Sequence, residues 1–243
     1  MKNRGIRHRP VRPLVAWRAL RQLFQNPERT DLVFVIIRAL SGNSLERTFT
    51  RVMADPAGRR TLDEDRSLLD TLSDLDRLRT LPEGTLGRTY AAFMDEQGLT
   101  ARDLVDASRE DAEDLEYLDP RARRLGERLR DMHDLWHVAA GYSRDLLGED
   151  ALLAFTYAQT RNRGVGFIAL MAMLELWRNG LREALPVVRN GYRRGRDAAF
   201  LAAVDWEALL EQPLDAVRAE LHLGDPPSYT PLWSEQQAEP QPA

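Results

Sequence analysis

Apolar residues recur along most of the chain at intervals of three and four, the spacing that places them on one face of an α-helix. A clear example is the series Leu68, Leu69, Leu72, Leu75 and Leu78. No segment shows the strict apolar–polar alternation that is typical of a half-buried β-strand. The pattern therefore predicts an all-α fold, a single-domain helical bundle. The expected helices span residues 13–25, 27–40, 43–53, 63–78, 85–96, 100–107, 120–140, 150–178, 181–203 and 213–221.

Proline, glycine and capping residues mark where these helices begin and end. Pro120 stands at the start of a long apolar pattern, where proline is tolerated because the first helical turn leaves its N–H groups unpaired. Asn43 and Glu46 have the spacing of a capping box. Pro56 and Gly58 lie together between two helical patterns and predict a turn.

We expect one helical, metal-binding domain over residues 26–224, because no internal repeat or linker interrupts the helical pattern. Residues 225–243 are rich in proline and polar residues and predict an extended or partly disordered tail. Residues 1–25 form a separate basic amphipathic segment, with seven Lys and Arg and no Asp or Glu. Its apolar residues gather on one helical face: Leu14, Trp17, Leu20, Leu23 and Phe24. Such a helix either lies on an anionic membrane surface or packs against the domain.

Composition excludes several kinds of site. The chain has no cysteine, which excludes disulfides, thiolate metal sites and cysteine nucleophiles. A net charge of −4 does not suit a protein that coats nucleic acid. No stretch reaches the roughly 18–20 apolar residues that a membrane-spanning helix needs. The chain has one lysine beside 33 arginines, which we attribute to genome composition, so a single arginine is weak evidence for an anion site.

The most informative segment carries His133 and His137, followed after eleven intervening residues by Glu149. Two histidines four residues apart lie on one helical face, so their imidazoles can converge on one ion. Gly141 is suited to end this helix, because glycine accepts the left-handed conformation. A chain reversal there would bring Glu149, in the first turn of the next helix, to the same ion. We therefore predict a divalent-metal site with these three ligands.

Asp134 stands about 100° around the helix from His133, so it either binds the ion or orients a ligand. The alternative to a metal site is a pair of ordinary surface or core histidines. Two observations favour the metal: the other histidines, His8 and His222, lie near the termini, and the pair has apolar neighbours. Further along, Gly164 and other small residues among large apolar ones either open a groove for a prenyl chain or allow close helix packing.

The pattern His133-Asp134-x-x-His137, eleven residues, Glu149 resembles the ligand motif of the coenzyme Q (ubiquinone) biosynthesis protein 4 family. Residues 81–93, with Leu81-Pro82-Glu83-Gly84-Thr85-Leu86-Gly87 before Tyr90 and Phe93, and residues 206–218 also resemble that family. The resemblance covers roughly residues 28–232. Its ligand motif is specific, because residue types, spacing and position in the chain agree together.

This resemblance implies a metal, zinc with iron as the alternative, held at His133, Asp134, His137 and Glu149. It implies ubiquinone synthesis by loss of the carboxylate from a prenylated 4-hydroxybenzoate ring, with hydroxylation at the same carbon. The implied partners are a prenylated aromatic or isoprenoid lipid, other ubiquinone-synthesis proteins and a membrane surface, and a homodimer is left open. Since no transit peptide is visible, we expect a bacterial member, in the cytoplasm and peripheral on the inner membrane.

Alternative roles for the metal remain. In an enzyme, the ion polarises the carboxylate and phenolate oxygens of the aromatic acid. Zinc accepts no electrons, so an oxidative route needs dioxygen to attack an electron-rich phenolate, or iron in place of zinc. The second reading is a non-catalytic isoprenoid-binding scaffold with a structural metal, although structural zinc sites are usually closed and rich in cysteine. A zinc hydrolase with Asp134 as base is disfavoured, because aspartate is one carbon shorter than the glutamate of the His-Glu-x-x-His pattern.

Overall fold

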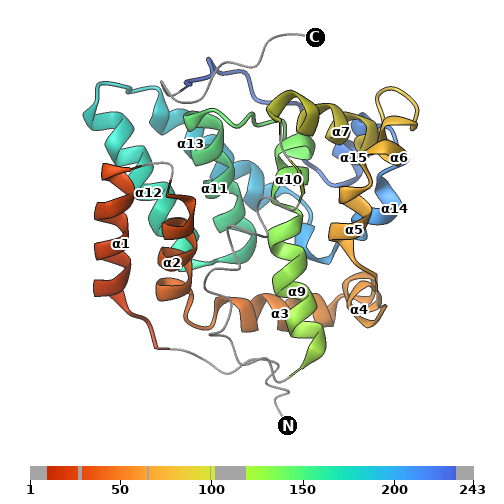
Figure 1. Cartoon of the computed structure of the whole chain (residues 1–243), viewed down its shortest axis with the longest axis horizontal. Coiled ribbons are helices and arrows are strands. Elements are labelled where there is room, and N and C mark those ends of the chain that lie inside the picture. Colours follow the sequence, from red (N-terminus) through yellow and green to blue (C-terminus); the bar gives the residue numbers. More distant parts are fainter. Residues whose placement is uncertain (1–9, 27–28, 65, 99, 102–118, 234–243) are drawn as a thin grey trace.

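The computed structural model of the protein describes residues 10–26, 29–64, 66–98, 100–101 and 119–233. These residues form α-helices and one short 3-10 helix, without any β-strand, so the all-α, single-domain prediction is confirmed (Figure 1). The elements in the first half are α1 (Pro13–Gln25), α2 (Thr30–Ser41), α3 (Ser44–Ala54), α4 (Pro56–Asp63), α5 (Leu68–Ser73), α6 (Leu75–Arg79) and α7 (Leu86–Gln97). Those in the second half are α9 (Pro120–Asp131), α10 (His133–Ala140), α11 (Leu146–Thr160), α12 (Arg163–Arg178), α13 (Ala184–Asp197), η2 (Leu201–Ala203), α14 (Trp206–Leu209) and α15 (Leu214–Glu220).

Helix α11 lies in the middle of the molecule and packs against α13, α12, α10 and α3 (Figure 1). It is apolar on most of its circumference, which is the sequence character of a helix surrounded by others. Helix α13 approaches it through two glycines. A Cβ atom on Gly191 would lie 2.2 Å from the backbone oxygen of Ala151, and one on Gly195 would lie 2.5 Å from that of Phe155. The two backbones are therefore in direct contact.

The N-terminal helices form a second layer with α12. Buried Ala16, Ala19 and Leu20 of α1 pack with Ile36 of α2 and Ile168 of α12. Leu20 is thus buried, although the sequence placed it on the same face as Leu14 and Trp17. None of the described helices is both long enough and apolar enough to cross a membrane.

Helix α12 makes close contacts at two of the small residues for which the sequence allowed either a prenyl groove or close helix packing. A Cβ atom on Gly164 would lie 2.5 Å from the Cα atom of Ile37, and one on Gly166 would lie 2.7 Å from the ring of Tyr157. At these two positions the small residues allow helix packing, and no space for a prenyl chain remains there.

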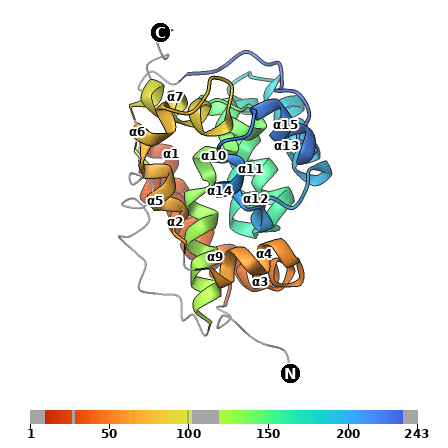
Figure 2. The same ribbon diagram turned by 90° about the vertical axis from the view of Figure 1, so that its right-hand side faces the viewer.

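Two helices that the sequence predicts as continuous are divided. The one expected over residues 120–140 breaks at Met132, whose ψ of 2° interrupts the helical backbone. Its two parts have different partners: α9 packs on α3, α4 and α5, whereas α10 packs on α7 and α15 (Figure 2). The one expected over residues 150–178 breaks at Arg161, which has a φ of 53°, and Asn162 then caps α12 through the N–H groups of Gly164 and Val165. Hydrophobic periodicity does not detect such a cap inside an apolar stretch.

The first half of the chain also departs from the prediction. The turn expected at Pro56 and Gly58 is wrong, because Asp55 caps a helix, α4, that begins at this proline. The capping box is wrong as well, since Asn43 accepts a hydrogen bond from Arg47 and does not cap α3. The helix expected over residues 63–78 is two short ones, because Asp74 caps a new start.

The remaining helices differ less from their predicted bounds. The helix expected over residues 181–203 ends at Asp197 and is followed by η2. The helices expected over residues 13–25, 85–96 and 213–221 are confirmed as α1, α7 and α15. The one expected over residues 100–107 lies almost entirely outside the described residues.

The contact between α11 and α13 leads to a stability prediction. In Gly191→Ala, the new methyl group meets a backbone oxygen that cannot rotate away, so we expect the free energy of unfolding to fall by about 1–3 kcal/mol. Gly166→Ala is the matched control, because the nearest atoms to its methyl group belong to the Tyr157 side chain, which can shift where a backbone cannot, and alanine favours a helix. Urea unfolding of both variants measures the difference. Equal stabilities would contradict the proposed contact.

Candidate metal centre

Helix α10 presents both central histidines on one side. The ring centroids of His133 and His137 lie 4.9 Å apart, with the rings edge to face. Phe93 of α7 stacks on His137 at a centroid distance of 5.8 Å and an interplanar angle of 24°. The i, i+4 spacing therefore brings the two imidazoles together, and the Phe93 ring packs against that of His137.

Two arginines hold the C-terminal end of α10. Arg218 of α15 donates from Nε to the backbone oxygen of Ala139 and from Nη2 to that of Val138, each at 3.1 Å. Arg194 of α13 donates from Nη1 to the oxygen of Ala140 at 2.8 Å. The last carbonyls of a helix have no partner within it and carry partial negative charge, so these cations stabilise the end of the histidine helix.

The chain then reverses direction within a few residues. Gly141 has a φ of 75° and ends α10 in the left-handed conformation, as the sequence predicts. The carboxylate of Asp145 accepts hydrogen bonds from the N–H groups of Leu147 at 3.0 Å and Gly148 at 3.2 Å, and so starts α11. Glu149 stands in the first turn of that helix.

This reversal brings the three predicted ligands together. Glu149 Oε2 lies 3.4 Å from Nε2 of His137 and 3.7 Å from Nε2 of His133. Ligand atoms of all three residues lie within 4.8 Å of one another. The His137 side chain is fully buried, whereas those of His133 and Glu149 are 25% and 27% exposed. The group is therefore closed on one side and open to solvent on the other.

The hydrogen bonding of His137 suits a metal ligand. Its Nδ1 atom lies 3.0 Å from the backbone oxygen of Tyr142. A carbonyl oxygen only accepts, so Nδ1 carries a proton and Nε2 is the ring nitrogen that lies beside Glu149. Nε2 is buried and has no hydrogen-bond partner among the described residues. A buried ring nitrogen without a hydrogen-bond partner, close to a second histidine and a carboxylate, fits a bound cation.

Charge reinforces the ligand state of Glu149. Burial acts to raise the pKa of this carboxyl group, but His137 and His133 outweigh burial and hold the pKa well below its usual range. Arg144 adds a contact from its Nε to Glu149 Oε1 at 3.2 Å. Glu149 is therefore ionised at neutral pH, as a metal-binding carboxylate must be.

The structure does not bring Asp134 into this group. Its side chain is buried on α10, but its oxygens are not among the ligand atoms that gather around Glu149. Its charge acts on neighbouring groups: with burial as the larger cause, it raises the pKa of Tyr90. The alternative in which Asp134 orients a ligand fits this placement better than direct binding.

Four residues that the sequence did not single out shape the site: Arg194, Arg218, Asp145 and Tyr229. Tyr229 donates to Asp145 Oδ2 at 2.9 Å and thereby ties a C-terminal residue to the loop between the ligand helices. Asp145 had a detectable signal, since an aspartate just before an apolar helix is a common N-cap. The arginines had none, because they are two among 33.

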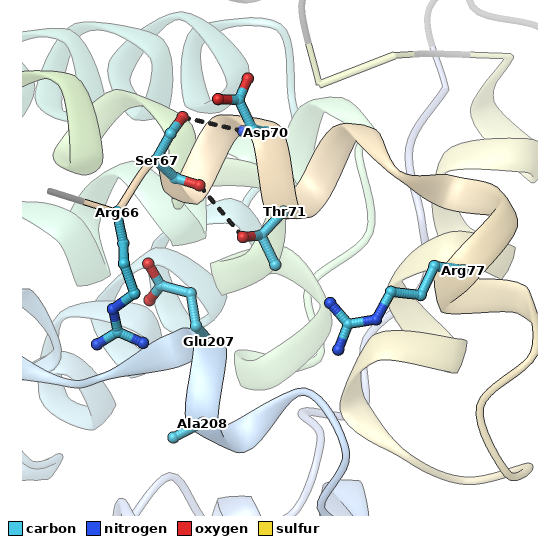
Figure 3. Close-up of a pocket in the computed structure, with 7 residues that line it drawn as sticks. All are labelled: Arg66, Ser67, Asp70, Thr71, Arg77, Glu207 and Ala208. Atoms are coloured by element: carbon cyan, nitrogen blue, oxygen red, sulfur yellow. Dashed lines mark hydrogen bonds between the residues drawn. The ribbon is translucent and has the colours of Figure 1, made fainter.

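Figure 3 shows a hollow lined by residues of α5, α6 and α14, which carries no comparable chemistry. Arg66, Arg77 and Glu207 line it. Each of the three is paired with a residue of opposite charge. Arg66 pairs with Asp205 at 2.9 Å, and Arg77 pairs with Glu211 at 3.1 Å. Glu207 forms a two-bond ion pair with buried Arg128, at 2.6 and 2.8 Å. This pair joins α9 to α14, so we assign it a structural role.

The geometry predicts which substitutions remove a bound metal. We expect His133→Ala and His137→Ala to lose zinc and to keep their helical circular dichroism, because a domain of this size has ample apolar core without the ion. Glu149→Gln should lose more zinc affinity than Asp134→Asn, which removes a charge of the same sign one residue from His133. Metal analysis after dialysis against zinc measures all four. Full zinc occupancy in both histidine variants would refute the site.

Comparison with known proteins identifies relatives along most of the chain. The family model described as Coenzyme Q (ubiquinone) biosynthesis protein Coq4 matches residues 11–227. The ubiquinone biosynthesis protein COQ4 homolog of Danio rerio is 33% identical over 212 residues, which cover 84% of this chain and 73% of the relative. The COQ4 protein of Scheffersomyces stipitis is 27% identical over 87% of this chain, which spans 65% of that relative's length.

A crystal structure shows the same fold. A protein of Nostoc punctiforme, named for ubiquinone biosynthesis, superimposes with a TM-score of 0.64 at 22% identity, over 89% of this chain and 100% of that one. The fold is thus shared with a solved protein, and the sequence matches extend from the first helix to the segment after α15. From these matches, this chain belongs to the coenzyme Q (ubiquinone) biosynthesis protein Coq4 family.

Proposed function

We propose that this member of a ubiquinone biosynthesis family removes the ring carboxylate of a prenylated 4-hydroxybenzoate in a metal-dependent reaction. The observation that carries the proposal is the free, buried Nε2 atom of His137, which points to a histidine and an ionised carboxylate at a partly open site. Two imidazoles and one carboxylate leave coordination positions for a substrate, as catalytic metal sites do.

A divalent cation in this site, zinc or iron, would supply a Lewis acid for the carboxylate and phenolate oxygens of an aromatic acid. The residues of the chain do the rest. Phe93 and the Tyr142 carbonyl hold His137 in one orientation, and Arg144 orients Glu149. The substrate enters from the side on which His133 and Glu149 are exposed.

The atoms of the reaction balance with one external oxidant. The bond from the ring carbon to the carboxylate carbon breaks, and the carboxylate leaves as carbon dioxide. Replacing it by a hydroxyl group is a two-electron oxidation of the ring. Water supplies the hydroxyl oxygen, and dioxygen, the acceptor that we assign, takes up the two electrons and two protons and leaves as hydrogen peroxide. Zinc would only bind the substrate oxygens, whereas iron would also take part in the electron transfer.

The second candidate is a scaffold that binds isoprenoid lipids and carries a structural metal. A groove favours it, lined by apolar residues of α12, α13, the turn between them and the C-terminal segment: Leu176, Leu181, Val187, Pro231 and Leu232. A hydrocarbon chain fits such a lining. The same groove would serve the tail of a substrate equally well, so variants of the metal site must separate the two functions.

The two functions predict different lipids in cells that depend on this protein for ubiquinone. With Glu149→Gln, which preserves side-chain size and weakens ligation, we expect accumulation of a prenylated 4-hydroxybenzoate that still carries its carboxylate. Loss of a scaffold would lower several later intermediates together. Lipid extraction with mass spectrometry measures both. Glu220→Gln, an exposed change on α15, is the control. Normal ubiquinone with a stable Glu149→Gln protein would exclude the catalytic function.

We further propose that the protein lies on the cytoplasmic surface of a bacterial inner membrane through α1. Leu14 is 72% exposed and Trp17 is 50% exposed, and Arg18 and Arg21 lie beside them on the exposed side. Helix α12, which packs against α2 like α1, also exposes a stripe: Leu170, Leu174 and Trp177. Large apolar residues with flanking cations suit an anionic lipid surface.

The charge of the exposed α1 face favours a membrane surface as its partner and disfavours a second copy of the chain. Residues 1–25 carry seven basic and no acidic residues, so two copies that met through α1 would repel each other. Anionic lipids attract the same residues, each by about 1 kcal/mol.

Vesicle binding tests the membrane surface. We expect the double variant Leu14→Ser, Trp17→Ser to bind anionic vesicles of phosphatidylglycerol and phosphatidylcholine several-fold more weakly, and added salt to weaken the wild type. Point variants are preferable to removing α1, because Ala16, Ala19 and Leu20 belong to the core. Leu185→Ser, an exposed change on α13, is the control. Unchanged binding by the double variant would contradict this surface.

A further inference from the structure

The loop between the two ligand helices is covered by the C-terminal segment, residues 226–232, which we call the strap. At one end, Pro226 packs on Gly141 so closely that a Cβ atom on this glycine would lie 2.8 Å from Pro226 Cβ. At the other end, the backbone N–H of Leu146 donates to the oxygen of Leu232 at 2.8 Å. The strap therefore contacts the end of α10 and the beginning of α11.

Tyr229 connects the middle of the strap to the loop. Its hydroxyl oxygen accepts a hydrogen bond from the backbone N–H of Ser143 at 3.1 Å and donates to Asp145 Oδ2 at 2.9 Å. Its ring lies beside that of Tyr142, with centroids 6.2 Å apart. Tyr142 is the residue whose carbonyl orients His137.

Asp145 is where these contacts meet. It is fully buried and accepts five hydrogen bonds. One oxygen accepts from the N–H groups of Leu147, Gly148 and Leu232, the last at 2.8 Å. The other oxygen accepts from the hydroxyl groups of Ser143 and Tyr229. A buried carboxylate needs such donors, and two of the five come from the strap.

Arg194 joins the start of the strap to the histidine helix. Besides the oxygen of Ala140, its guanidinium donates to the backbone oxygens of Leu223 and Asp225, each at 2.9 Å from Nη2. The segment that leads into the strap and the last turn of α10 thus share one cation.

We propose that the strap is a positioning element of the metal centre, with Asp145 and Tyr229 as its positioning residues. When the strap is docked, Asp145 fixes the first turn of α11, and with it the distance from Glu149 to the two histidines. Metal binding and strap docking therefore stabilise each other, and each strengthens the other by the same factor. This inference rests on the metal site proposed above.

Tyr229→Phe tests the inference, because it keeps the ring and removes only the hydroxyl group. We expect the zinc dissociation constant, measured by competition with a chromophoric chelator, to rise at least about 10-fold, as for other residues that orient metal ligands. Ser143→Ala removes a second donor to Asp145 and should act in the same direction. Tyr192→Phe is the matched control, since its hydroxyl accepts from Arg161 at 2.7 Å, away from the loop.

The reverse effect separates positioning from ordinary stabilisation. Hydrogen exchange of the Leu146 and Leu232 amides should slow when zinc is added to the wild type, and slow less in Tyr229→Phe. Equal zinc affinities of the Tyr229→Phe and wild-type proteins would contradict the positioning role of the strap but not the metal site. Hydrogen exchange that zinc leaves unchanged would do the same. A wild type that binds no zinc would overturn both.

Discussion

The candidate metal centre depends on the pairing of two helix ends that meet at one loop. The end of α10 has carbonyl groups without helical partners, and the beginning of α11 has N–H groups without partners. Only a few residues separate them, so both must be satisfied in a small, largely buried space. Arg194 and Arg218 supply positive charge to the carbonyls, and Asp145 supplies negative charge to the N–H groups. These three side chains keep the histidines and Glu149 facing each other.

The three proposed ligands differ in burial, and this suits a site at which the proposed substrate exchanges. His137 is buried, stacked on Phe93 and held by a backbone carbonyl, so it is the fixed point of the site. His133 and Glu149 border solvent. A substrate oxygen can approach from their side without moving the buried ligand. A closed site with every ligand buried would instead favour a structural metal.

The sequence predicted the convergence of His133, His137 and Glu149 better than the frame that holds them. The spacing of His133 and His137 places them on one helical face, and Gly141 predicts the chain reversal that brings Glu149 close to them. Arg194 and Arg218 act across the fold, and nothing local distinguishes them among 33 arginines. The same limit explains the errors in the helices. The break at Met132 follows from the different partners of α9 and α10, which periodicity does not contain.

The two glycines of α13 have an effect beyond close packing. They fix the register of the two helices: sliding α13 by one turn along α11 would leave a glycine at only one of the two contact points, and a larger side chain would meet the α11 backbone at the other. Arg194 immediately precedes Gly195, so this register also sets the height at which its guanidinium meets the last turn of α10. A lineage that lost either glycine would have to rebuild the reach of this arginine. Evolutionary freedom at the candidate metal centre is thus limited by residues that have no side chain and contact none of its three proposed ligands.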